Sequence, residues 1–285
     1  MNRLPLAEFE DLSGSLRNIN RARAASRARC ANDPVTRALI DAGIRLLQWQ
    51  FARGDGRAVE DDDLDRDLLR FVSQRRVVRE AEREWPEIGV TMPKFRNRWT
   101  SHQYYVADLI RFALTDRQWS LRVAIDQAEN ILSNSAEFAS AVHRIALADL
   151  ADSRQPEYRF KLVAATMAER DPVVRAALAD MYHTLTVAWA EVYRATLEGF
   201  GVKLRPGITY EMLTKMISAT AEGTALRVLS DHDSDVISPD GQTSMLGTAA
   251  IAIVSSVIDP GDGRDIESLL NDTIAAVQQQ TRQAG

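Results

Sequence analysis

Apolar residues recur at intervals of three and four along most of this 285-residue chain. The clearest run follows Asp171-Pro172, where a capping aspartate and a first-turn proline favour a helix start, and it ends before Gly199 and Gly201. Its apolar positions are Val174, Leu178, Met181, Leu185, Ala188 and Val192. Sustained alternation of apolar and polar residues, which is typical of strands, is absent. The pattern therefore predicts an all-α fold.

The same periodicity and the helix-capping residues predict a series of further helices. Asp33-Pro34 is expected to open one that runs to about Arg53, before Gly54 and Gly56. A short helix around 68–72 and a helix at 74–84, capped by Ser73, are expected next. The remaining helices are expected at about 101–115, 117–132, 136–152, 156–169, 172–200, 208–230, 242–258 and, in the tail, 264–280.

The segment from Gly89 to His102 combines a turn, a short basic helix and a second helix start. Thr91 can cap the short helix, and Pro93 suits its first turn. Lys94, Arg96 and Arg98 are predicted to point outward. Phe95 and Trp99, four residues apart, are expected to share the buried face, and Thr100 with Gln103 matches a capping box for the next helix. This combination is typical of a helix that reads DNA.

The segment resembles the end of the helix-turn-helix in tetracycline-repressor-like (TetR family) regulators. The family pattern has a Gly-Val-Ser turn, a short helix ending in Tyr-x-x-Phe, and a Pro-Ser-Lys start to a connecting helix. The matching residues are Gly89, Val90, Thr91, Phe95, Trp99 and Ser101. Arg96, Trp99 and His102 stand where the family usually has Tyr, Phe and Lys, and residues 84–88 lengthen the turn.

The resemblance implies a homodimer that binds a palindromic operator in double-stranded DNA, most simply as a repressor. Thr91, Met92 and Lys94 would face base edges in the major groove. Arg96, Asn97, Arg98 and His102 would hold phosphates. The implied architecture is an N-terminal three-helix DNA-binding domain at 33–115 and a larger ligand-binding and dimerisation domain at 116–260, followed by a tail at 261–285.

Charge is distributed unevenly along the chain. Residues 1–115 carry a net charge of +3 and residues 116–285 a net charge of −8, which suits a nucleic-acid-binding part joined to an acidic partner domain. Residues 12–30 hold five arginines and no acid, so residues 1–32 are expected to form a flexible basic arm. Arg17, Arg21 and Arg23 are its candidate DNA contacts in the minor groove. An inert tail is an equal alternative.

In TetR-like proteins the later helices enclose a ligand cavity and form the dimer interface. The candidate residues for a pocket that takes a small organic effector are Phe138, His143, Phe160, Met167, Met181, Tyr182, Trp189 and Tyr193. The candidate interface residues are Thr220, Gly223, Thr224 and Arg227. Plain core packing is the alternative for the aromatic set. A helix crossing within one chain is the alternative for Gly223.

Enzymatic signatures are absent, so the sequence predicts neither an enzyme nor a cofactor. Asp180 and His183 share a helix face, but no second motif accompanies them, which favours hydrogen bonding over a metal site. The acidic runs 60–67 and 231–235 lack the spacing of a calcium loop and are interpreted as polar loops.

No apolar run reaches a membrane span and no signal peptide is visible, so a cytoplasmic protein that does not bind membranes is expected. A rival hypothesis makes the chain a helical enzyme or a plain binding protein. In that case residues 89–102 would form only a packed structural corner.

Overall fold

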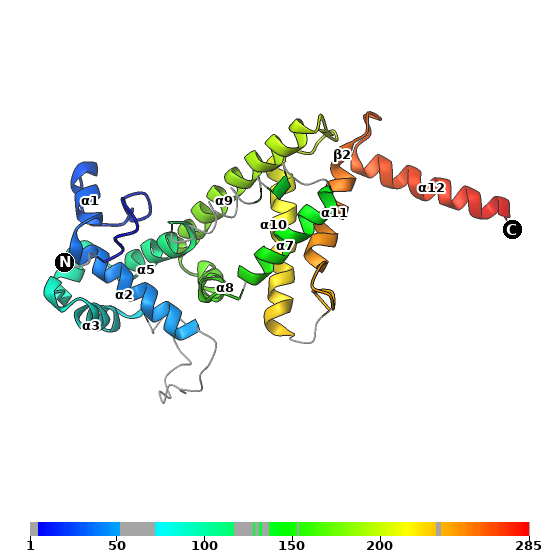
Figure 1. The fold of residues 1–285 in the computed structure, drawn as a ribbon. Coiled ribbons are helices and arrows are strands. Elements are labelled where there is room, and N and C mark those ends of the chain that lie inside the picture. Colours follow the sequence, from blue (N-terminus) through cyan, green and yellow to red (C-terminus); the bar gives the residue numbers. More distant parts are fainter. Residues whose placement is uncertain are drawn as a thin grey trace. The chain divides into compact units, whose positions relative to one another are not determined.

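The structure is a computed structural model that describes residues 5–51, 72–116, 128, 131–132, 137–152, 154–231 and 235–284. It is mostly helical, with one two-stranded antiparallel sheet, which confirms the predicted all-α class (Figure 1). The chain divides into two compact units: unit 1 comprises residues 1–122 and 154–184, and unit 2 comprises 123–153 and 185–285. None of the described helices combines the length and apolar character needed to cross a membrane.

Unit 1 is built around one central helix, α2. Its elements are α1 (Ala24–Ala31), α2 (Pro34–Phe51), α3 (Gln74–Glu84), a 3₁₀ turn η2 (Pro86–Ile88), α4 (Met92–Arg98), α5 (His102–Arg111), a π-helical turn η3 (Phe112–Asp116), α8 (Pro156–Ala168) and the first part of α9 (Pro172–Gly199). Helix α2 packs against α3, α4, α5 and α8. The predicted stop at Gly54 and Gly56, the acidic run 60–67 and most of the short helix at 68–72 lie outside the described residues.

Unit 2 consists of three packed helices, the second part of α9, and a small sheet. Its elements are α7 (Phe138–Asp152), β1 (Lys203–Leu204), α10 (Tyr210–Ser230), α11 (Met245–Val257), β2 (Ile258–Asp259) and α12 (Ile266–Ala284). Helices α7, α10 and α11 contact one another, as Figure 1 shows. Lys203 of β1 lies opposite Asp259 of β2. The predicted tail helix is confirmed, whereas most of the predicted helix at 117–132 lies outside the described residues.

Local capping signals fixed most helix starts as predicted. Asp33 Oδ1 accepts from the backbone N–H of Thr36 at 2.9 Å, and Asp171 Oδ1 accepts from Val174 N–H at 3.1 Å. The expected capping box at Thr100 is wrong by one residue. Ser101 caps α5 instead, and its hydroxyl accepts from the N–H of Tyr104 at 3.3 Å.

The prediction of a flexible basic arm at residues 1–32 is wrong for residues 5–32. Its apolar side chains are buried: Leu6, Leu12, Leu16 and Ile19. The buried guanidinium of Arg37 in α2 donates to the carbonyls of Leu6 at 2.7 Å and Phe9 at 2.9 Å. Counting arginines without weighing these leucines hid a segment that contributes to the core of unit 1.

The domain boundaries differ from the prediction of 33–115 and 116–260. Residues 154–184 belong to unit 1 because α8 packs on α2 and on η3. Asp180 in α9 accepts from the guanidinium groups of Arg17 at 3.0 Å and Arg111 at 3.1 Å, which also holds this segment to unit 1. Helix α9 therefore contributes its first part to unit 1 and its second part to unit 2.

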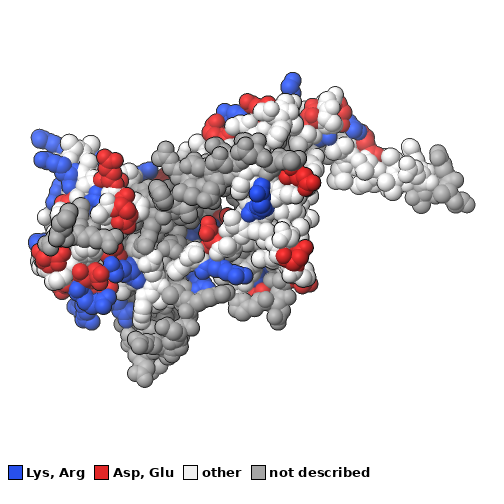
Figure 2. Space-filling view, in the orientation of Figure 1, with Lys and Arg blue, Asp and Glu red and all other residues white. Residues whose placement is uncertain are grey.

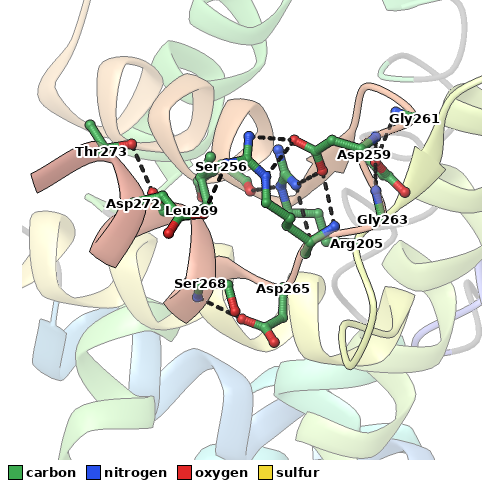
Figure 3. Close-up of polar contacts among 12 residues, drawn as sticks. Arg205, Ser256, Asp259, Gly261, Gly263, Asp265, Ser268, Leu269, Asp272 and Thr273 are labelled. Carbon is green, nitrogen blue, oxygen red and sulfur yellow. Dashed lines mark hydrogen bonds and ion pairs between the residues drawn. The ribbon is translucent and has the colours of Figure 1, made fainter. Parts of the chain in front are cut away.

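The loop that leads into α12 is fixed by Arg205, whose side chain is buried (Figure 3). Its guanidinium donates to the Ser256 carbonyl at 3.1 Å, to the Asp262 carboxylate at 2.7 Å and to the Arg264 carbonyl at 3.0 Å. The Arg264 backbone N–H and then the Arg205 side chain hold the pKa of Asp262 well below its ordinary value. These contacts define where α12 begins.

Candidate nucleic-acid interface

Helix α4 is introduced by a tight turn and a capped first residue. Gly89 has a φ of 61°, a left-handed conformation that glycine adopts without steric cost. It turns the chain from η2 into an extended Thr91, whose hydroxyl accepts from the N–H of Lys94 at 3.4 Å. The predicted cap is confirmed, and it fixes the start of α4.

The buried face of α4 is aromatic, as predicted. Phe95 and Trp99 are fully buried and their ring centroids lie 5.4 Å apart. Tyr105 of α5 completes the cluster, with its ring 5.0 Å from each of the other two. This cluster anchors α4 to α5, while α2 and α3 also contact α4.

The opposite face of α4 is polar and exposed. Thr91, Lys94, Arg96 and Asn97 are exposed, and Met92 is half-buried. The ammonium of Lys94 donates to the carbonyl of Gly89 at 2.6 Å, next to the helix start. One short helix thus presents two cations, an amide and a hydroxyl on a single surface.

Arg98 does not belong to that surface, so the prediction that it points outward is wrong. Its side chain is 9% exposed and its guanidinium donates to both carboxylate oxygens of Asp33 at 2.8 Å. It also donates to the hydroxyl of Thr36 at 2.7 Å. A cation at this distance from a bidentate carboxylate is already paired, and it ties the end of α4 to the start of α2. It is therefore a poor candidate for a phosphate contact.

His102 differs from its prediction to a smaller degree. The residue is half-buried, and its ring stacks on Tyr105 with centroids 6.2 Å apart. It therefore supports the aromatic cluster below α4.

A buried carboxylate that the sequence analysis missed organises the base of this region. Asp108 in α5 accepts from the indole N–H of Trp99 at 2.9 Å and from the backbone N–H groups of Arg17 and Asn18 at 3.1 Å. Burial raises the pKa of Asp108 to about 6, although these donors and the nearby Arg111 oppose the rise. The only signal in the sequence was one acid inside the apolar run 106–114.

The three candidate arginines before α1 have different surroundings. Arg17 forms an ion pair with Asp180, so part of its charge is already neutralised. Arg21 donates to the backbone carbonyl of Asn97 at 3.0 Å, and the N–H of Asn20 donates to the carbonyl of Arg98 at 2.7 Å. Arg23, the residue before α1, is exposed. These bonds hold the basic α1 segment at the end of α4.

Helix α3 adds basic residues that the sequence analysis did not single out. Arg75 and Arg79 are exposed on α3, whereas Arg83 pairs with Glu80 at 2.6 Å. Figure 2 shows Lys and Arg side chains gathered over α1 and over α3 in unit 1, with acidic side chains between them. The signal that could have found them was the run Gln74-Arg75-Arg76 behind a capping serine.

The predicted ligand-pocket residues divide between the two units. Phe138, Trp189 and Tyr193 line a cavity in unit 2. Phe160, Met167, Met181 and Tyr182 lie in unit 1, so their assignment to the same pocket is wrong. His143 also does not line the cavity: its ring lies against Gly247, and its Nδ1 accepts from the N–H of Ser244 at 3.3 Å. Helical periodicity alone could not separate these sets, because α9 contributes to both units.

The predicted interface residues on α10 are exposed only in part. Gly223 and Arg227 are exposed, and a Cβ added at Gly223 would meet nothing within 4 Å. This open space contradicts the alternative in which Gly223 serves a close helix crossing within the chain. Thr224 is buried, and its hydroxyl donates to the carbonyl of Thr220 at 2.8 Å. Thr224 is therefore wrong as a contact residue for a second subunit.

Comparisons with protein-family models, with curated proteins and with solved structures find no match to this chain. Within the described part of the chain, no group of three His, Cys, Asp or Glu side chains could hold a metal ion. Function therefore has to be inferred from the residues and their arrangement.

Proposed function

We propose that the protein is a homodimeric, TetR-type transcriptional regulator in which α3, the turn at 85–91 and α4 form a helix-turn-helix. The observation that carries this proposal is the division of α4 into two faces. Phe95 and Trp99 anchor it in the core, while Lys94 and Arg96 stand on the exposed side. A short helix presented in this way has the dimensions and the donors needed to enter a major groove.

Each exposed group of α4 then has a distinct task. Thr91, Met92 and Lys94 lie at the start of the helix and read base edges: Lys94 donates to guanine acceptors, and Met92 contacts a thymine methyl. Arg96 and Asn97 bind phosphates and set the register. Arg75 and Arg79 of α3 and Arg23 before α1 add sequence-independent attraction to the backbone.

A two-fold dimer requires a self-complementary surface, and α10 offers a candidate. Gly223 and Leu226 are exposed on one side of this helix, with Leu226 49% exposed, next to Arg227. Small and apolar residues on an exposed helix face allow the same helix of a second copy to approach closely. Ligand binding in unit 2 would change the spacing of the two α4 helices in the dimer.

The test begins with selection of bound DNA from a random pool, followed by affinity measurements on the selected palindrome. Lys94→Ala is expected to cost about 1–3 kcal/mol of binding free energy and to relax preference at one position in each half-site. Arg96→Ala is expected to weaken binding to all sequences and to lower the log–log salt slope by about 0.9 for each subunit.

Lys215→Ala is the matched control, because Lys215 is an exposed lysine on α10 in the other unit. It should leave both affinity and sequence preference unchanged. A Lys94→Ala protein with wild-type affinity and selectivity would remove α4 from the groove. Wild-type protein that is monomeric and selects no DNA at low salt would support the rival hypothesis, in which residues 89–102 form a packed corner.

Gly223→Leu tests the dimer interface, since a bulky side chain at this position would separate two closely packed copies of α10. The expected result is a monomer in size-exclusion chromatography with light scattering. Gly223→Ala is the control: it should keep the dimer and stabilise the helix by about 1 kcal/mol. A Gly223→Leu protein that remains a dimer of normal stability would place the interface elsewhere.

A further inference from the structure

Unit 2 encloses a cavity of about 120 Å³ between α7, the second part of α9, α10 and α11. Its walls are mainly apolar, with residues such as Val142, Leu213, Ile217 and Ala250 facing the space. An engineered apolar cavity of roughly 150 Å³ is known to hold benzene, so this space suits a single ring or a short branched alkyl group. The size alone says nothing of charge.

The polar lining supplies that information. Among the described residues around the cavity, Asp149 is the only one with a formal charge, and it lies at an exposed position on α7. The other polar side chains are hydroxyls, from Tyr193, Thr196 and Ser218. Burial and then the negative charge of Asp149 raise the pKa of Tyr193, so the field of this carboxylate reaches the buried phenol. No positive side chain from the four surrounding helices lines the space to oppose it.

The aromatic lining acts in the same direction. Trp189 and Tyr193 follow one another on α9, with ring centroids 5.8 Å apart, and Phe138 of α7 also lines the cavity. The faces of aromatic rings carry negative potential and attract cations, with tryptophan the strongest of the three types. An anionic ligand would meet a carboxylate and electron-rich ring faces with no compensating cation, and would be excluded.

We propose that this cavity binds a monovalent lipophilic cation, an organic ammonium whose apolar body enters between the helices while its charged head stays beside Asp149 and the aromatic rings. That such a ligand would control DNA binding rests on the function proposed above. The binding itself does not, and it can be measured on the protein without DNA.

Benzyltrimethylammonium is a suitable probe, because its charge is permanent and its phenyl ring matches the cavity. Neopentylbenzene has the same shape with carbon in place of nitrogen. Calorimetric titration of the full chain is expected to show about tenfold tighter binding of the cation than of the neutral compound, and no binding of phenylacetate. Asp149→Asn should remove most of this preference and leave the affinity for neopentylbenzene within about twofold of wild type.

Two further variants keep the test sharp. Glu191→Gln removes an exposed carboxylate from the same helix as Trp189 and should leave the preference for the cation intact. Ala221→Phe fills the cavity and should abolish binding of both probes, with circular dichroism confirming the fold. Equal affinity for the two probes, no binding of either, or an unchanged preference in Asp149→Asn would each overturn the inference. Cation binding by a protein that selects no DNA would instead overturn only the proposed function.

Discussion

Trp99→Ala should destabilise unit 1 by about 3–5 kcal/mol, the range for removal of a large buried aromatic side chain. Trp99 is fully buried, contacts the rings of Phe95 and Tyr105, and donates its indole N–H to the buried carboxylate of Asp108. Its loss would leave a cavity and also remove a donor from Asp108. Because folded proteins are stable by only about 5–15 kcal/mol, much of unit 1 would unfold. Urea denaturation followed by circular dichroism measures the effect.

Two variants separate the causes of that loss. Trp99→Phe keeps most of the ring packing and lacks the indole donor, so it should cost about 1–3 kcal/mol. Trp49→Ala removes the same residue type from α2, where it is 56% exposed, and should change stability by no more than about 0.5 kcal/mol. If Trp99→Ala were as stable as Trp49→Ala, the aromatic cluster would not hold α4 in place.

Arg98→Ala should destabilise the free protein by about 3 kcal/mol, the lower end of the range for breaking a buried ion pair, because Asp33 remains partly exposed. The substitution would also leave the buried hydroxyl of Thr36 without its donor. Arg98→Lys should not restore stability, since an ammonium cannot reproduce the bidentate contact with Asp33 and reach Thr36 as well. Thermal denaturation of the DNA-free protein is the direct measurement.

Arg96→Ala provides the contrast, two residues away on the exposed face. It should leave the stability of the free protein unchanged while lowering DNA affinity and the salt slope. Arg98→Ala, measured below its unfolding temperature, should keep the wild-type salt slope. The opposite pattern, a stable Arg98→Ala protein whose salt slope falls by about 0.9 per subunit, would make Arg98 a phosphate contact after all.

The sequence alone determined the features that depend on neighbours along the chain. Helix starts at Pro34, Gln74, Met92 and Pro172 follow from capping residues and first-turn prolines, because a cap acts within three or four residues. The burial of Phe95 and Trp99 followed from their spacing on one helix face. Short-range physics of this kind is visible in any stretch of about ten residues.

Only the tertiary structure decided which charged side chains are available. Arg98 is paired because Thr36 and Asp33, more than 60 positions earlier, lie beside it, and Arg17 meets Asp180 across 163 positions. The segment before α1 became part of the core because its leucines contact unit 1, although its arginines suggested a solvated arm. A charge gains its role from the partners that folding brings to it, and the free energy of that pairing has no local signature in the sequence.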